Sequence, residues 1–395
     1  MDKKQRLVKK NLKHGVAFAS KFGDFIETSV GKALENHDYL AYELPENPES
    51  NTWYRVTLDK GMSGDGSEYY IYVKIGDPDK LCIFFSGGGM AWNEYTAARP
   101  VTVGKAAAWE PNFYWNNLRP FTQIFNINVG ITDISSPKNP FRDWSFVVVT
   151  YATGDLHVGN SDYTYKTEDG GEDVLHFHGY INFLESMKVS KRLFPNPKRI
   201  LIAGNSAGAF AVPALAGEIA DDWYPKTGSI TLFSDSGMVL YKKWRKTAKT
   251  IWQSKESIWE PIVSDNITLD WYRNLYDKYG DRFRYLYSSS ERDYLLSAYY
   301  NEIVNKKYKT DKKVQDVYKK QLTEMISELK KITPSFGVYV DDFKLPIITM
   351  GGTVHTSVRE LHFAVFTQDG ISMAKWLGDA VDGKVYDVGL RLLEK

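Results

Sequence analysis

The sequence predicts an α/β fold in which a mostly parallel central sheet is flanked by helices. Short apolar runs end repeatedly in glycine or serine, which is typical of strands buried on both faces. Helical patterns lie between these runs, as strand–helix alternation requires. The simplest organisation is one domain over residues 51–395 that follows an N-terminal helical extension over residues 1–50. An irregular insertion is expected over residues 106–139.

Candidate strands occur along most of the chain. Residues 52–58 and 69–75 flank a glycine-rich segment, so we expect them to pair as antiparallel strands. The remaining strands are expected where an apolar run meets glycine or a small polar residue, at residues 80–85, 145–151, 199–203, 230–233, 284–287 and 345–350.

Three segments between the strands predict helices. Residues 179–193 form one candidate, and residues 207–219 form a compact helix of small residues that contains Pro213. Apolar residues recur at 3.6-residue spacing over residues 314–329 in a lysine-rich stretch. This pattern indicates an amphipathic surface helix whose charges face solvent.

The charge balance and the cysteine count exclude several classes of protein. The 395 residues include 50 basic and 49 acidic side chains, which argues against a protein that coats nucleic acid. The one cysteine, Cys82, excludes a disulfide scaffold and a cysteine-based zinc cluster. It lies inside an expected strand, so we expect an inert core residue. No run is long enough for a signal peptide or a membrane span, so we expect a cytoplasmic protein.

The sharpest local pattern is Gly204-Asn205-Ser206-Ala207-Gly208, which joins an expected strand to an expected helix. This is the context of a nucleophile elbow, where a tight turn projects a serine hydroxyl above the sheet. Ser206 is therefore the candidate nucleophile. The alternative is a serine that only caps the helix.

A second glycine-rich segment, Ser86-Gly87-Gly88-Gly89, follows an earlier strand. Hydrolases with a nucleophile elbow take a backbone N–H for their oxyanion hole from such a loop. We therefore expect oxyanion donors at Gly88, Gly89 and Ala207. The alternative is a phosphate-binding loop, but the P-loop pattern and its lysine are missing.

A serine nucleophile needs a histidine base and an acid that orients it. His355 follows the last expected strand, whereas His362 falls in an expected helix over residues 358–366 and is more easily explained by packing. Asp293 follows the strand at 284–287 and is the preferred acid. The acids that compete with it are Asp235, Glu291, Asp341 and Asp342, the last two in an expected solvent-exposed turn.

For two further groups of residues, a binding role is compared with a purely structural one. His176-Phe177-His178 places two imidazoles at strand spacing, but without a recognisable third ligand we expect no metal there. Five aromatic residues are candidates for a sugar-stacking groove, and the alternative for them is the core: Trp92, Tyr95, Trp109, Trp115 and Tyr151. The candidate substrate-binding residues are Trp92, Asn93 and Tyr151.

These motifs together resemble the pectin acetylesterase family of carbohydrate esterases, to which the Notum carboxylesterase is also related. The resemblance rests on Gly87-Gly88-Gly89 with Trp92 and Asn93, the segments 149–160 and 179–182, the serine motif, Asp235-Ser236-Gly237, the Asp293 segment, His355-Thr356 and Trp376, in that order. Members usually carry a cysteine after the glycines and another before the serine, where this chain has Ala91 and Asn205.

The resemblance implies an α/β-hydrolase-like fold that cleaves carboxylic esters, typically acetyl groups on sugars such as those of pectin. It carries over Ser206 as nucleophile, Asp293 as acid and His355 as base, with an oxyanion hole that extends at most to Met90. It implies a small-molecule or oligosaccharide ester as substrate, no cofactor and no nucleic-acid partner. The alternatives are a catalytically silent binding protein on a hydrolase scaffold and an esterase or lipase for longer acyl chains.

Overall fold

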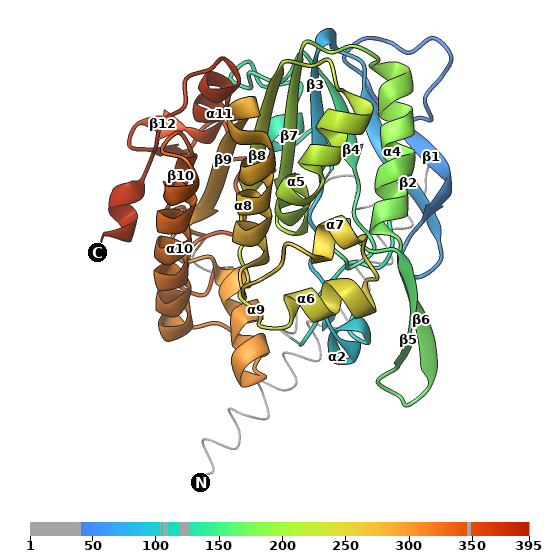
Figure 1. The fold of residues 1–395 in the computed structure, drawn as a ribbon, viewed down its shortest axis with the longest axis vertical. Coiled ribbons are helices and arrows are strands. Elements are labelled where there is room, and N and C mark those ends of the chain that lie inside the picture. Colours follow the sequence, from blue (N-terminus) through green and yellow to red (C-terminus); the bar gives the residue numbers. More distant parts are fainter. Residues whose placement is uncertain (1–40, 103, 106–109, 119–125, 346–348, 395) are drawn as a thin grey trace.

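A computed structural model of the protein describes residues 41–102, 104–105, 110–118, 126–345 and 349–394. Its centre is an 8-stranded sheet in the order β1-β2-β4-β3-β7-β8-β9-β10 (Figure 1). β1 pairs antiparallel with β2, and β2 pairs antiparallel with β4. From β4 to β10 every pairing is parallel. The mixed, mostly parallel sheet confirms the predicted α/β class.

The strands of the main sheet are β1 (Trp53–Met62), β2 (Glu68–Lys74), β3 (Asp77–Phe85), β4 (Trp144–Val149), β7 (Arg199–Asn205), β8 (Ser229–Asp235), β9 (Phe283–Ser290) and β10 (Gly337–Asp341). Two small sheets accompany it. One is the hairpin of β5 (Ser161–Lys166) and β6 (Glu172–Phe177), which projects from the body of the molecule at the lower right of Figure 1. The other pairs β11 (Thr367–Gln368) with β12 (Ile371–Ser372).

Helices cover both faces of the main sheet. One face carries α4 (Gly179–Leu193), α5 (Ala207–Glu218), α8 (Ile267–Tyr279) and α10 (Lys312–Ile332), which lie toward the viewer in Figure 1. The opposite face packs against α11 (Met373–Val381), where the buried ring of Trp376 contacts Phe233 and Tyr339. Four further helices lie in the lower part of the molecule in Figure 1: α2 (Glu94–Ala97), α6 (Trp244–Lys246), α7 (Glu256–Trp259) and α9 (Tyr294–Asn305).

The structure confirms most of the expected elements and corrects the last strand. A strand was expected at residues 345–350, of which 346–348 lie outside the described residues; of the others, Leu345 is 42% exposed and residues 349–350 form a turn. The last strand of the main sheet is β10, which is buried along its whole length and pairs with β9. Asp341 ends this strand and is buried, so its expected place in a solvent-exposed turn is wrong.

Other expectations concern the less regular segments. Residues 358–366 form turns and not the expected helix, and the β5–β6 hairpin was not expected. The expected extension over residues 1–50 falls mostly outside the described residues, and residues 41–50 contain no helix. The described parts of the insertion at 106–139 are irregular, apart from one short 3₁₀ turn.

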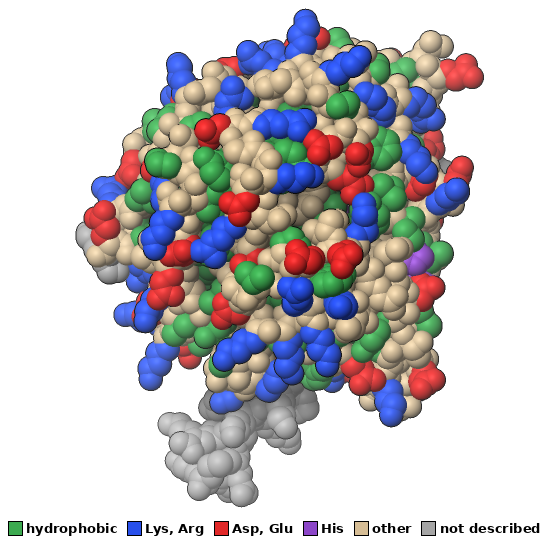
Figure 2. Space-filling model, viewed as in Figure 1, with side chains coloured by type: hydrophobic (Ala, Val, Ile, Leu, Met, Phe, Trp, Pro, Cys, Tyr) green, Lys and Arg blue, Asp and Glu red, His purple; other side chains and the backbone are tan. Residues whose placement is uncertain are grey.

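The surface mixes both signs of charge. Figure 2 shows Lys and Arg side chains interspersed with Asp and Glu over the face that it draws. Among the described residues, no helix is both long enough and apolar enough to cross a membrane.

Candidate active site

The turn between β7 and α5 holds Ser206 in a strained conformation. Its φ of 53° and ψ of −123° lie outside the regions that residues with a side chain ordinarily adopt. The two glycines of the motif are required by close packing. A Cβ atom on Gly204 would collide with the carbonyl of Gly208, and one on Gly208 would collide with that of Phe85. The turn therefore has the geometry of a nucleophile elbow.

The glycine loop after β3 lies against this elbow. A Cβ on Gly87 would come within 2.6 Å of the Ser206 Cβ, so a side chain there would push the loop away from the serine. The Gly87 N–H donates to Asn205 Oδ1 at 3.1 Å, which joins the loop to the residue before the serine. Gly89 has a φ of 79°, a conformation that glycine adopts at little cost.

Three backbone N–H groups next to Ser206 remain available for a ligand. Among the described residues, those of Gly88, Gly89 and Ala207 make no hydrogen bond within the protein. The Met90 N–H instead donates to Phe113 O at 2.7 Å. The loop therefore offers donors at the expected glycines, and Met90 is excluded from the set.

The structure brings His355 and Asp293 together. His355 Nδ1 lies 2.7 Å from Asp293 Oδ2, and the Asp293 side chain is completely buried. The other oxygen, Oδ1, accepts the N–H groups of Leu295 and Leu296 at the start of α9. An acidic N-cap is stabilised by the helix dipole. The helix thus fixes the carboxylate, and the carboxylate orients the imidazole.

The second nitrogen of His355 is prepared to exchange a proton. Nε2 is buried and has no hydrogen-bond partner among the described residues. Burial lowers the pKa of His355, but the charge of Asp293 and its hydrogen bond outweigh burial, so the pKa is raised above 6.5. A histidine with one nitrogen held by a carboxylate and the other free is arranged as a general base.

Asp235, at the end of β8, connects the elbow to the histidine loop. Its carbonyl accepts the Ser206 N–H at 2.8 Å. Its carboxylate Oδ2 accepts the N–H groups of Ser357 and Val358 at 2.7 and 2.8 Å, just after His355. Burial raises the pKa of this carboxyl, and these hydrogen bonds oppose the rise. Asp235 therefore has its oxygens committed to positioning the backbone.

Two of the other candidate acids, Glu291 and Asp341, have partners of their own. Glu291 forms ion pairs with Lys319 and Arg292 at 2.8 and 2.6 Å. Asp341 accepts the Ser357 hydroxyl at 2.9 Å, and Asp342 is half-buried beside it. Of the acids considered, the structure places Asp293 at His355.

A small cavity of about 110 Å³ opens beside the elbow. Among its lining residues are Gly87, Trp115, Tyr151, Asn205 and Arg359. Two larger hollows, of about 320 and 340 Å³, lie near the amino ends of the strands, away from the elbow and the glycine loop. We therefore take the smaller cavity as the candidate site.

The three expected substrate-binding residues have different environments. Tyr151 lines the cavity, and its hydroxyl accepts the Leu156 N–H at 2.9 Å. Trp92 is 1% exposed and packs among aromatic rings, including Phe113. Asn93 caps α2 by accepting the Thr96 N–H. Trp92 and Asn93 do not line the cavity, so the structure gives them packing and capping roles.

Sequence reasoning missed Arg359, a cation at the wall of the cavity. It is 5% exposed, and one of its nitrogens donates to Ser86 Oγ at 3.2 Å. Its Nε has no partner among the described residues. Burial lowers the pKa of the guanidinium to about 9. Nothing in its segment marks it, because the expected helix there would have made it an ordinary surface residue.

The buried carboxyl of Asp341 makes stability depend on pH. Burial raises its pKa from 3.8 to about 7, so the folded chain keeps a proton that the unfolded chain releases above about pH 4. Stability should fall as pH rises from about 4 to 7, by on the order of 4 kcal/mol. Asp341→Asn should therefore gain stability over the wild type as pH rises, measured by urea unfolding between about pH 5 and 8.

Asp379→Asn provides a control of opposite sign. The Lys375 ammonium holds the pKa of Asp379 below its usual range, so its contribution is present at neutral pH and is lost only in acid. This variant should be less stable than the wild type by a constant amount over the same pH range. A constant difference for Asp341→Asn as well would contradict the role of Asp341.

Comparison with known proteins gives one family. The family model described as Pectinacetylesterase matches residues 62–268, just over half of the chain. The matched range contains the glycine loop, Ser206 and Asp235, and it ends before Asp293 and His355. No individual curated protein matches the chain. With this match and an α/β sheet that carries the glycine loop and the serine turn in their expected places, the chain belongs to the pectinacetylesterase family.

Proposed function

We propose that this protein is a serine esterase that removes acetyl groups from a carbohydrate through a covalent acyl-enzyme. The observation that carries the proposal is the hydrogen-bonded pair of Asp293 and His355. It lies at the carboxyl end of the sheet, where the strained Ser206 turn and the glycine loop also lie. Membership of the family supports an ester hydrolase of the carbohydrate-esterase type.

In the first half of the reaction, Ser206 Oγ attacks the ester carbonyl carbon while His355 Nε2 takes its proton. The carbonyl oxygen becomes negative, and the N–H groups of Ala207 and the Gly88–Gly89 segment stabilise it. His355 then donates the proton to the departing alcohol oxygen. The sugar hydroxyl leaves, and the acyl group stays on the serine.

In the second half, a water molecule attacks the acyl carbon and His355 accepts its proton. The proton returns to Ser206 Oγ as the acid is released, so ester and water give alcohol and carboxylic acid. Asp293 holds the imidazole in the required tautomer and stabilises its cationic form.

The cavity supports a short acyl group. Its volume of about 110 Å³ is well below the roughly 300–1,000 Å³ of typical ligand clefts. The buried ring of Tyr151 and the buried side chain of Arg359 are parts of its wall, so lengthening it requires rearrangement of packed side chains.

Replacement of the nucleophile gives the first test. Ser206→Ala should lower kcat on an aryl acetate by roughly 10³-fold or more, because the serine supplies the bond-forming atom. A fluorophosphonate probe should label the wild type at Ser206 and leave the variant unlabelled, as read by intact-mass spectrometry.

Ser229→Ala is the matched control for this experiment, since Ser229 begins β8 at the opposite edge of the sheet. It should retain both labelling and activity. A folded wild type that takes up no probe and hydrolyses no ester would instead support a silent binding protein.

The pH dependence of kcat/KM gives the second test. His355 acts as a base only when neutral, so activity should fall as pH drops through its pKa, which lies above 6.5. Asp293→Asn removes the charge that raises this pKa. The acidic limb should therefore move to lower pH, and kcat should fall roughly 10⁴-fold because the tautomer is lost.

Glu360→Gln provides the comparison, since the charge of Glu360 raises the same pKa to a smaller extent. It should move the limb in the same direction by less. An acidic limb that stays in place in Asp293→Asn would count against the pairing of Asp293 with His355.

The acyl preference gives the third test. Along a series of acetyl, butyryl and octanoyl esters of one alcohol, kcat/KM should fall steeply after acetyl, because the cavity is small. Acetylated oligosaccharides should then release acetate, measured enzymatically. Equal or rising rates toward octanoyl would favour a lipase-like enzyme.

A further inference from the structure

We propose that Asp162, His176 and His178 form a binding site for one divalent transition-metal ion, with Zn²⁺ as the best fit. The site is independent of the esterase chemistry proposed above. None of the three residues lines the cavity beside Ser206. The sequence analysis found no third ligand for the two histidines, and the structure supplies it.

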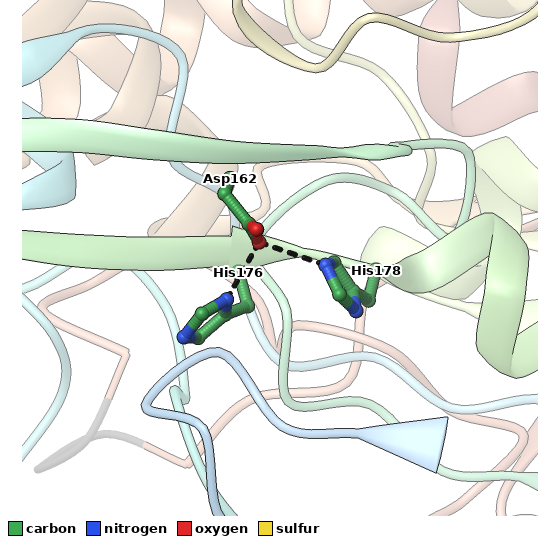
Figure 3. A group of neighbouring side chains, drawn as sticks. All are labelled: Asp162, His176 and His178. Atoms are coloured by element: carbon green, nitrogen blue, oxygen red, sulfur yellow. Dashed lines mark hydrogen bonds and ion pairs between the residues drawn. The ribbon is translucent and has the colours of Figure 1, made fainter. Parts of the chain in front are cut away.

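Strand register explains why the three side chains meet. Asp162 on β5 is the direct cross-strand partner of His176 on β6. Paired residues point to the same face of a hairpin, and side chains two apart on an extended chain do so as well. His178 follows His176 by two residues and lies directly before α4. In Figure 3 both imidazoles turn toward the Asp162 carboxylate.

The two imidazoles converge on one oxygen. His176 Nδ1 lies 2.6 Å and His178 Nε2 lies 2.8 Å from Asp162 Oδ1. All three potential ligand atoms lie within 4.8 Å of one another. Tetrahedral zinc, with bonds of about 2.0–2.2 Å, needs ligand atoms roughly 3.3 Å apart. The two N···O separations of 2.6 and 2.8 Å are therefore short of this spacing by about 0.5–0.7 Å, which a small shift of the carboxylate would supply.

The carboxylate of the site is free to move, whereas hydrogen bonds hold the backbones of the two histidines. Asp162 is 61% exposed, so its carboxylate can make the shift. The histidine backbones are held, since the His176 N–H donates to Gly64 O and the His178 N–H donates to His176 O, both at 2.9 Å. The ring nitrogens are thus presented from a fixed backbone, which reduces the ordering cost of binding.

The charge of the site also suits a cation. The Asp162 side chain supplies the one carboxylate of this group, and a carboxylate oxygen is a ligand that suits a divalent cation. Two imidazoles and one carboxylate are ligands that Zn²⁺ and its neighbours accept, and they leave a fourth position for water.

The position of the site indicates a structural effect. The β5–β6 hairpin projects from the body of the molecule, and His178 lies directly before α4 (Figure 1). The next residue, Gly179, donates its N–H to the buried carboxylate of Asp155 at 2.7 Å. A bound ion would clamp the hairpin to the start of this helix, and it would stabilise the folded chain by mass action.

Metal titration of the untagged, chelator-treated protein tests the proposal. Isothermal titration calorimetry with ZnCl₂ should show one equivalent bound per chain, and the zinc-bound protein should melt at a higher temperature. Co²⁺ in the same site should give the visible absorption of a low-coordinate ion. Asp162→Ala and His178→Gln should each weaken zinc binding by roughly 100-fold or more, since even outer-sphere partners contribute about 10–100-fold.

Asp173→Asn is the matched control, because Asp173 lies on the same hairpin and its carboxylate contacts the Tyr165 hydroxyl. It should bind zinc like the wild type. Absence of stoichiometric binding to the wild type would overturn the proposal, whether or not the variants fold. Binding that is unchanged in both ligand variants would overturn it as well, by placing the ion elsewhere.

Discussion

The buried carboxylate of Asp235 holds the candidate active site together. Its backbone carbonyl anchors the nucleophile turn, and its side chain anchors the loop that carries His355. The Ser288 hydroxyl, on the neighbouring strand, also donates to it at 2.8 Å. Parallel strands bring these segments to the carboxyl end of the sheet, but their loops diverge beyond it. The backbone carbonyl and the carboxylate of this one buried residue together fix the positions of three separate chain segments.

The two buried carboxylates, Asp235 and Asp293, therefore have different roles. Asp235 has its oxygens committed to backbone amides and a hydroxyl, whereas Asp293 keeps one oxygen for the imidazole of His355. The amides of α9 occupy the other Asp293 oxygen. The carboxylate is thereby prevented from rotating, and the histidine tautomer follows from helix capping. Asp235 therefore positions the backbone of the site, and Asp293 orients the histidine.

Sequence patterns predicted those parts of the molecule that short segments of the chain determine by themselves. The turn at Ser206 was predictable because two glycines are required where the backbones of Gly208 and Phe85 pass close by. The strands that end in glycine or serine were predictable because they are buried on both faces. Asp293 was preferred on its position after a strand, and the structure places it beside His355.

The failures share a different cause, since each depended on contacts between distant segments. The strand Gly337–Asp341 was not expected, and its pairing with β9 joins segments that lie far apart in the sequence. Asp162 has no signal as a partner of His176 until the hairpin register is known.

The hydrogen bond between Asn205 and the Gly87 amide has one more consequence. Asn205 makes this contact through its side-chain amide, and the thiol of Cys82, the one cysteine of the sequence, is completely buried in β3. Burial raises the pKa of that thiol far above its ordinary value, so it remains protonated and unreactive. The glycine loop is therefore joined to the nucleophile turn by a neutral amide contact. Reductants and oxidants that would open or form a disulfide leave this junction unchanged.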